Sequence, residues 1–211
     1  MNRDRDKIFE EYLEKGANVS KTAEESRGLI IEVASDIENE LTNIITWCFY
    51  PAQYSIKLLP DELLDKNGII FKSVILRKLS FSDKIDMLKE VIIARKPDIW
   101  QSYNHLIKEI SNKLHKAREF RNLMAHAPSD LSVKYIKSLN KHTYQSKNFF
   151  KVIEYKKGEL KEHTYNKEKI DNEMLKLLKI QLQLMQLFAV INEDIETYTS
   201  SQELVNVLSS S

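Results

Sequence analysis

The residues best suited to chemistry lie together in one short stretch, at the end of a long helical pattern. Arg121, Asn122 and His126 place a guanidinium, a carboxamide and an imidazole within six residues, and Pro128 follows them. Imidazole is the side chain best suited to moving protons near neutral pH. Guanidinium is the best planar donor for a phosphate. These residue types at this spacing predict acid–base chemistry on a phosphodiester.

The helix that carries these residues is expected over residues 98–125. Its apolar stripe comprises Tyr103, Leu106, Ile107, Ile110, Leu114 and Ala117. At about 100° per residue, the next inward position is Arg121. Asn122 and His126 share a face roughly 100° or more from Arg121, so they should lie toward solvent, a cleft or a second subunit. His126 also lies in the last turn, where the helix dipole favours a protonated imidazole.

Two interpretations of Arg121 are open at this point. A guanidinium left alone in a core is costly unless a carboxylate and hydrogen bonds satisfy it. Arg121 is therefore either a phosphate ligand or one partner of a structural ion pair. The candidate partners on the long early helix are Asp36, Glu38 and Glu40.

The elements that must position this stretch are expected to be mostly helices in a single domain. The chain has 211 residues with only 4 Gly and 4 Pro, and an apolar fraction of 42%. This composition favours long helices over a turn-rich all-β fold, and nothing within residues 1–211 reads as a linker. A core over about residues 22–195 and a loose tail over about residues 200–211 are expected. Besides the motif helix, helices are expected over residues 5–14, 22–49, 83–94 and 169–198.

Single residues set the expected ends of these helices. Gly16 should end the first helix and Pro51 the second. Ser82 makes an N-cap for the helix over 83–94, and Asn67-Gly68 is a turn signal in a less regular stretch. The apolar stripe of the second helix comprises Leu29, Ile30, Val33, Ile37, Leu41, Ile44, Ile45 and Phe49.

Residues 148–166 change character and predict two short strands. The glycine of Lys156-Lys157-Gly158 suits a short hairpin with a bulge. The wider segment 132–169 holds 10 Lys against 4 Glu, a difference of +6, with aromatic residues among the lysines. Such a surface is either simply solvated or attracts unpaired bases and phosphates. The candidate RNA-contacting residues are Lys151, Tyr155, Lys156, Lys157 and Lys161.

The motif resembles the R-x4-6-H motif of the HEPN superfamily, in which a polar residue such as asparagine commonly follows the arginine. Here it reads Arg121-Asn122-x-x-x-His126. The order of elements is similar as well: a long early helix, a middle helix over residues 81–89, and the motif helix before a final helix. The resemblance covers about residues 22–195.

The resemblance implies an all-α, HEPN-like helical bundle with long antiparallel helices, in which the hairpin near residues 148–166 is an insertion. HEPN proteins commonly dimerise, so that two motifs meet in one cleft. Many are metal-independent endoribonucleases of toxin–antitoxin, abortive-infection or CRISPR systems. By position, Arg121 would bind the scissile phosphate, His126 would act as general base or acid, and Asn122 would position either group. A cognate antitoxin or a nucleotidyltransferase is then the expected protein partner.

The residues themselves fit this chemistry. A ribose 2′-hydroxyl attacks its neighbouring phosphate when a base takes its proton and cations neutralise the developing charge. No metal or cofactor is expected, because the 5 histidines are scattered and the HExxH, CxxC, GxxxxGK[ST], GxGxxG and GxSxG patterns are absent from the sequence. One chain supplies one such histidine, so an acid and a base together predict a homodimer with a composite site. The nearly all-round apolar run over residues 175–191 supports this expectation.

A second function class is open as well: a non-catalytic helical binding or regulatory module. In that interpretation Arg121 is a structural ion pair, and the lysines and aromatic residues of segment 132–169 bind nucleic acid or a protein. The enzyme needs His126 exposed beside Arg121, whereas the module tolerates its replacement.

The compartment is expected to be the cytoplasm. The single cysteine, Cys48, cannot form an internal disulfide and lies in an apolar run, as a small core residue would. Residues 1–7 are charged and lack the apolar core of a signal peptide. Lys176 and Lys179 interrupt the most apolar later stretch, so no membrane span is expected.

Overall fold

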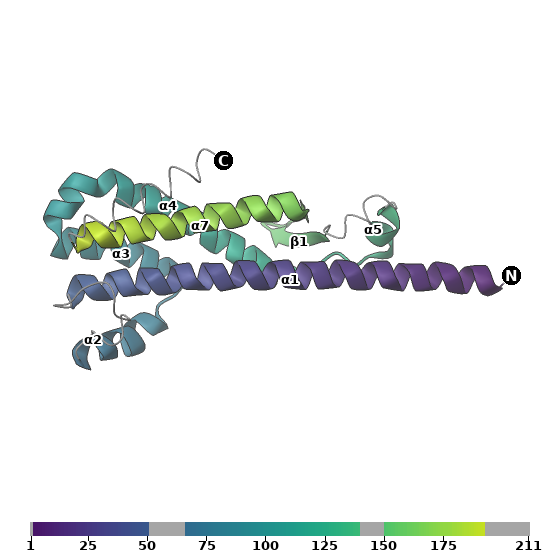
Figure 1. Ribbon diagram of the computed structural model, residues 1–211, viewed down its shortest axis with the longest axis horizontal. Helices are drawn as coiled ribbons and strands as arrows, with labels where there is room; N and C mark the ends of the chain where they lie inside the picture. The colour runs from purple at the N-terminus through teal and green to yellow at the C-terminus, as the bar shows by residue number, and fades with distance from the viewer. Residues whose placement is uncertain (1, 51–65, 140–149, 193–211) are drawn as a thin grey trace. The chain divides into compact units, whose positions relative to one another are not determined.

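The computed structural model describes residues 2–50, 66–139 and 150–192 and is mostly helical with one small sheet, as the sequence predicts (Figure 1). Helices make up 81% of the residues it describes. The predicted tail over 200–211 and the end of the predicted final helix lie outside the described residues. The helices are α1 (Asn2–Phe49), α2 (Lys66–Ile70), α3 (Phe81–Arg95), α4 (Pro97–His126), α5 (Val133–Ser138) and α7 (Lys167–Ile191). The strands are β1 (Phe150–Lys156) and β2 (Glu159–Tyr165).

The chain divides into two compact units. The first unit comprises Met1–Glu32 and Phe120–Met174, and the second comprises Val33–Glu119 and Leu175–Ser211. The divisions fall inside helices α1, α4 and α7. The motif residues and the hairpin belong to the first unit.

Helix α1 is longer than the sequence predicts. The expected break at Gly16 is wrong, because α1 continues from Asn2 to Phe49 through both Gly16 and Gly28. A glycine inside a helix costs about 1 kcal/mol relative to alanine, which the hydrogen bonds of a long uninterrupted helix offset. Leu29 is also placed wrongly by the predicted stripe, since it is 47% exposed while Ile30 is fully buried.

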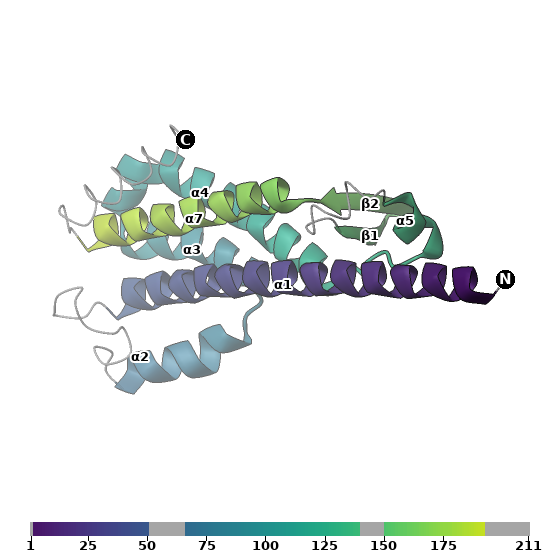
Figure 2. The same ribbon diagram turned by 45° about the vertical axis from the view of Figure 1, so that its right-hand side comes forward.

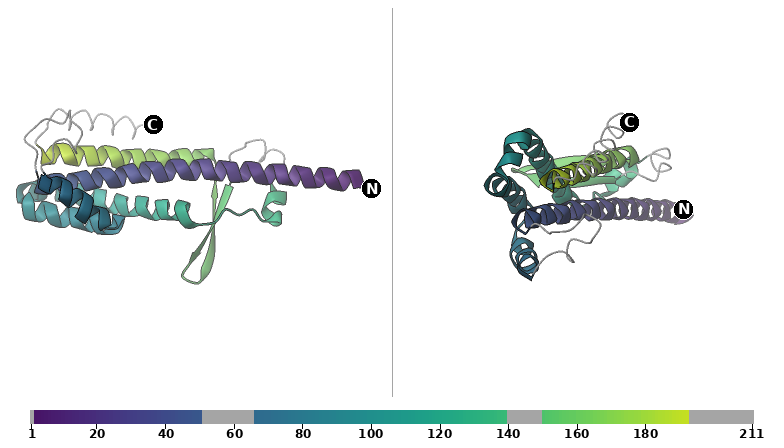
Figure 3. Two further views of the ribbon diagram at one scale, coloured as in Figure 1. Left: turned by 90° about the horizontal axis from the view of Figure 1, so that it is seen from below. Right: turned by 60° about the vertical axis from the view of Figure 1, so that its left-hand side comes forward.

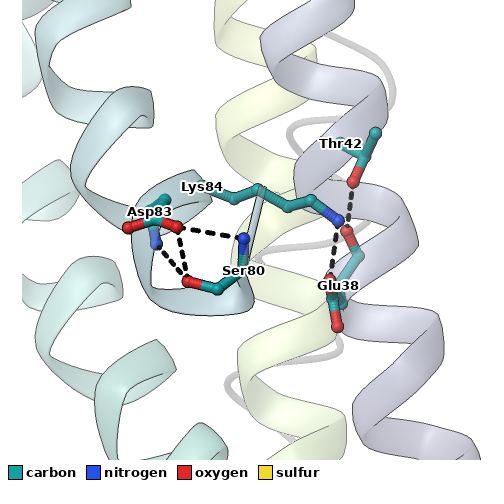
Figure 4. Close-up of polar contacts among 5 residues, drawn as sticks. All are labelled: Glu38, Thr42, Ser80, Asp83 and Lys84. Carbon is teal, nitrogen blue, oxygen red and sulfur yellow. Dashed lines mark hydrogen bonds and ion pairs between the residues drawn. The ribbon is translucent and has the colours of Figure 1, made fainter. Parts of the chain in front are cut away.

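Two further local predictions fail for local reasons. Asn67-Gly68 forms no turn but lies within α2. Helix α3 begins at Phe81, and its N-cap is Ser80 rather than Ser82. Ser80 and Asp83 form a capping box, in which the Asp83 backbone N–H donates to Ser80 Oγ (3.2 Å) and the Ser80 N–H to Asp83 Oδ2 (3.0 Å) (Figure 4). A capping box satisfies two backbone donors, which a lone serine at position 82 does not.

The second unit is a helical bundle in which α4 runs antiparallel to α1, while α7 runs in the same direction as α1 (Figure 1). Figure 2 shows α2 on the side of α1 away from α3 and α7. A π-helical turn (Phe71–Ile75) and a 3-10 turn (Leu76–Lys78) continue α2. Phe71 packs against Phe49 and Tyr50 of the α1 end, with ring centroids 5.0 and 5.6 Å apart. The fully buried side chains of this bundle include Leu41, Ile45, Leu88, Ile92, Ile110, Leu114, Leu184 and Leu187.

A buried ion pair crosses this bundle from α3 to α1. Lys84 Nζ lies 2.6 Å from Glu38 Oε1, and the two side chains are only 8% and 21% exposed (Figure 4). The hydroxyl of Thr42 donates to the Glu38 backbone carbonyl oxygen (2.8 Å). Both the side chain and the backbone carbonyl of Glu38 therefore have a side-chain partner. A buried cation of this kind is tolerated only with its partner in place.

Helix α7 is long and apolar enough to cross a membrane by length and composition, a test that core helices of soluble proteins also pass. Of its most apolar window, 44% is buried within the protein. Gln183 and Gln186 lie among its buried residues, and Gln183 Oε1 accepts a hydrogen bond from Lys113 (3.0 Å). The helix thus carries buried polar contacts to α4.

The hairpin has a simpler turn than the sequence predicts. Strands β1 and β2 pair without interruption from Phe150↔Tyr165 to Lys156↔Glu159, so the expected bulge is wrong. Lys157 and Gly158 both have positive φ, 55° and 84°, which is a two-residue turn of type I′. The left view of Figure 3 shows the twisted ribbon with its turn at the end far from α1.

Replacing Lys84 tests the buried pair. Lys84→Met should lower the free energy of unfolding by about 2–3 kcal/mol, because it leaves the Glu38 carboxylate largely buried and unpaired. Lys21→Met is the matched control, since Lys21 and Glu25 form an exposed pair 3.9 Å apart, and it should cost under about 0.5 kcal/mol. Urea denaturation measures both. Equal losses of unfolding free energy in the two variants would contradict a stabilising role of the buried Lys84–Glu38 pair.

Candidate active site

The C-terminal turns of α4 expose Asn122 and His126, as the sequence predicts, but do not bury Arg121 as expected. Met124 and Ala127 are buried, whereas Asn122 and His126 are exposed. Arg121, expected at a core position, is half-buried, and its Nη1 donates to Asn122 Oδ1 (3.4 Å). The guanidinium of Arg121 and the carboxamide of Asn122 thus lie side by side. The imidazole belongs to His126, the last residue of α4, and is exposed to solvent.

Two of the three carboxylates considered as ion-pair partners of Arg121, Glu38 and Glu40, have other contacts. Glu38 pairs with Lys84. Glu40 accepts a hydrogen bond from Gln181 Nε2 (2.8 Å), and burial raises the pKa of Glu40. Both carboxylates are therefore occupied within the second unit. The described contact of Arg121 is with its own neighbour, Asn122.

The end of α4 is held by α1. Arg27 Nη2 donates a short hydrogen bond to the carbonyl oxygen of Ala127, the residue after His126. The Ala127 N–H in turn donates to the Leu123 carbonyl oxygen (3.0 Å), which closes the last helical turn. Desolvation lowers the pKa of Arg27, and Glu24 opposes this effect. Tyr12, nearer the N-terminus of α1 than Arg27, donates a hydrogen bond from its hydroxyl to the Leu131 carbonyl oxygen (3.4 Å).

The hairpin holds the segment that follows the motif. The Ile153 N–H donates to the Pro128 carbonyl oxygen (3.0 Å), and the Asp130 N–H donates to the Lys151 carbonyl oxygen (2.8 Å). Ser129 forms an antiparallel bridge with Val152 between these two bonds. The outer edge of β1 thus pairs with the chain directly after α4. The hairpin, expected as an insertion, is part of the support of the candidate site.

A largely buried ion pair between Lys151 and Asp130, extended by the exposed Glu162, reinforces this contact. Lys151 Nζ lies 2.7 Å from Asp130 Oδ2 and 3.1 Å from Glu162 Oε2, and its ammonium sits 4.8 Å from the centre of the Tyr135 ring. The Lys151 and Asp130 side chains are 13% and 8% exposed. Lys151 is therefore engaged with two carboxylates and the Tyr135 ring, and its contact with RNA stays a prediction. Burial raises the pKa of Tyr135 to about 12.

The other candidate RNA-contacting residues are exposed at the turn end of the hairpin. Tyr155 is 73% exposed and pairs across the strands with Leu160, which is 71% exposed. Lys156, Lys157 and Lys161 are exposed as well. Glutamates oppose two of these lysines in the register, Glu159 opposite Lys156 and Glu154 opposite Lys161. Over residues 150–165 four lysines face three glutamates, so the net charge of the hairpin is only +1.

The sequence reasoning missed two contributors to this unit. Arg27 lies on the same face of α1 as the buried Val19, Ala23 and Ile30, and an arginine at an inward position is the signal that could have found it. His163 Nε2 lies 3.1 Å from Glu154 Oε2 on the face of the sheet that also carries Val152. That contact needs the strand register, which the residue types alone do not supply.

The structure offers no metal site or reactive thiol of its own in the residues it describes. No group of three His, Cys, Asp or Glu side chains that could hold a metal ion occurs among residues 2–50, 66–139 and 150–192. Cys48 is buried, and desolvation raises its pKa to about 11, so its thiol is protonated near neutral pH.

The chain was compared with protein families, curated proteins and solved structures. No protein-family model, curated protein or solved structure matches the chain.

Removing the charge of Asp130 tests the cluster beside the motif. Burial disfavours ionisation of Asp130, but hydrogen bonds from Lys151 and Ser132 outweigh it, so its pKa lies below the ordinary 3.8. A lowered pKa stabilises the fold at pH values above the ordinary pKa, and this contribution disappears as the pH falls through the lowered value. Asp130→Asn should lower the free energy of unfolding by about 2 kcal/mol at pH 7.

The difference from the wild-type protein should shrink on acidification toward about pH 2, because the contribution of the ionised Asp130 carboxylate is lost as the pH falls through its lowered pKa. Urea denaturation at the two pH values measures it. A difference that stays the same at both would show that the ionised carboxylate contributes nothing.

Proposed function

We propose that the protein is a metal-independent endoribonuclease of HEPN type, acting in a toxin–antitoxin or phage-defence system. The observation that carries the proposal is the end of α4, where Arg121 bonds to Asn122 and His126 is exposed on the last turn. A guanidinium and an imidazole on adjoining turns supply a cation for the phosphate and one of the two proton-transferring groups that cleavage by 2′-hydroxyl attack uses.

In the proposed reaction the 2′-hydroxyl of the nucleotide before the cut attacks the adjacent phosphorus. A base removes the hydroxyl proton, the bond to the 5′-oxygen of the next nucleotide breaks, and an acid protonates that oxygen. The products are a 2′,3′-cyclic phosphate and a 5′-hydroxyl. Arg121 neutralises the charge on the phosphate oxygens, His126 transfers a proton, and Asn122 holds the guanidinium in place.

A homodimer with a composite site completes this mechanism. The motif supplies one imidazole, and the reaction uses both an acid and a base. Leu178 and Met185 on α7 are 42% and 41% exposed, which is apolar surface that a second copy of the chain would cover. A cognate antitoxin or a nucleotidyltransferase partner and a cytoplasmic location belong to the same proposal.

A non-catalytic binding module is the second candidate, and the turn end of the hairpin favours it. Tyr155 and Leu160 are the most exposed large apolar side chains among the described residues, and they are cross-strand partners on one face. The adjoining pairs, Lys156 with Glu159 and Glu154 with Lys161, balance in charge and lie on the opposite face of the two-stranded sheet. Large apolar side chains exposed together on one face are typical of a surface that binds protein.

Replacing the motif residues separates the two candidates. In EDTA, the wild-type protein should cleave RNA, and Arg121→Ala and His126→Ala should each reduce cleavage by at least about 100-fold, because each removes a group used in the transition state. Gel analysis of end-labelled RNAs measures the rates.

His105→Ala is the matched control, since His105 is an exposed histidine on the same helix outside the motif. It should keep the wild-type rate. Equal rates for all four proteins, or no cleavage by any of them across several RNAs, would favour the binding module.

The exposed lysines of the hairpin provide a test of RNA binding. The double variant Lys157→Gln, Lys161→Gln should bind single-stranded RNA more weakly, with a slope of log affinity against log salt smaller by about 1.4, or 0.7 for each lost phosphate contact. Lys66→Gln with Lys78→Gln is the matched control, because both lysines are exposed in the other unit. Equal slopes for both double variants would mean that the hairpin lysines only solvate the surface.

A further inference from the structure

The buried face of α1 in the first unit carries a positive charge. Arg27 lies between the buried Ala23 and Ile30, and no ion pair of Arg27 occurs among the described residues. Its Nη2 donates to the carbonyl oxygen of Ala127, and its Nε is buried without a hydrogen-bond partner. Burial lowers the pKa of Arg27, and the Glu24 carboxylate, three residues earlier on α1, opposes this effect by favouring the charged form. Its described hydrogen bond is to the end of the motif helix.

We infer that Arg27 is a positioning residue for His126, which fixes the last turn of α4 through the Ala127 carbonyl oxygen and thereby sets where the imidazole stands. As a statement about cleavage, this inference rests on the proposed function. As a statement about the helix end, it stands on the contact itself.

The need for such a contact follows from the chain. The last carbonyl groups of a helix have no partner within the helix, and the end frays unless something satisfies them. Pro128 comes two residues after His126 and cannot continue the helix. A cation at this end also interacts favourably with the helix dipole. Arg27 meets both needs from a position one hundred residues earlier in the chain.

The hydrogen bond also connects the motif to the rest of its unit. The Pro128 carbonyl oxygen accepts from Ile153 of β1, so consecutive carbonyl groups are held by α1 and by the hairpin. His126 directly precedes this pair of fixed groups. Losing the Arg27 contact would leave the Ala127 carbonyl oxygen without its described side-chain donor, while the hairpin still holds the Pro128 carbonyl oxygen.

Steady-state cleavage kinetics test the catalytic part of the inference. Arg27→Met should lower kcat by about 10- to 100-fold, because a displacement of about 1 Å at a catalytic group costs that much. KM should change by less than about 3-fold, since Arg27 does not touch the substrate in this account. Arg27→Lys keeps a cationic donor and should recover kcat to within about 5-fold of the wild-type value. Lys21→Met, an exposed change on the same helix, is the control and should keep both constants.

Amide hydrogen exchange tests the helix end without any cleavage. The Ala127 N–H, which donates to Leu123, should exchange at least about 10-fold faster in Arg27→Met than in the wild-type protein, and nearly at the wild-type rate in Arg27→Lys. Amides in the middle of α4 should keep their rates in both variants. This pattern separates a loosened helix end from general unfolding.

The outcomes are distinguishable. A raised KM with unchanged kcat would make Arg27 an RNA-binding residue and overturn the inference, as would unchanged exchange at Ala127 in Arg27→Met. If the wild-type protein cleaves no RNA, the proposed function fails. The exchange measurement then still decides whether Arg27 fixes the end of α4.

Discussion

The structure around the motif depends on how the C-terminal end of α4 is fixed. A helix end leaves carbonyl groups without partners, and here two distant parts of the chain supply the donors: Arg27 of α1 to Ala127, and the Ile153 N–H of β1 to Pro128. The Asp130–Lys151–Glu162 cluster then holds the next residues against the hairpin. Because His126 immediately precedes these groups, the geometry of the candidate site is determined by long-range contacts and not by the helix alone.

The second unit is organised by a different constraint, a cation placed in a helical core. Lys84 on α3 is almost completely buried and is tolerated there because Glu38 on α1 lies 2.6 Å away. The capping box at Ser80 and Asp83 fixes the start of the same helix one turn earlier. A side chain thus satisfies a backbone group at each of two helix ends. Arg27 donates to the Ala127 carbonyl oxygen after α4, and Ser80 accepts from the Asp83 N–H at the start of α3.

The elements that follow from local periodicity could be predicted from the sequence. The stripe through Ile110, Leu114 and Ala117 places α4 correctly, and it also gives the exposure of Asn122 and His126. Features that depend on partners could not be predicted. Gly16 ends no helix, since α1 continues through it from Asn2 to Phe49. Lys151 pairs with Asp130 and Glu162, which lie far from it in the sequence or on the opposite strand. The contact of Arg27 joins residues one hundred positions apart, which no residue pattern encodes.

We propose that His126 and Arg121 cleave RNA by attack of a 2′-hydroxyl without a metal ion. End-group analysis of an RNA cleaved in EDTA, beside the same RNA carrying a single 2′-deoxynucleotide before the cut, tests this proposal. A 2′,3′-cyclic phosphate is expected from the first RNA, and no cut at that position in the second. Cleavage at the deoxynucleotide, or dependence of cleavage on an added divalent cation, would rule the proposal out.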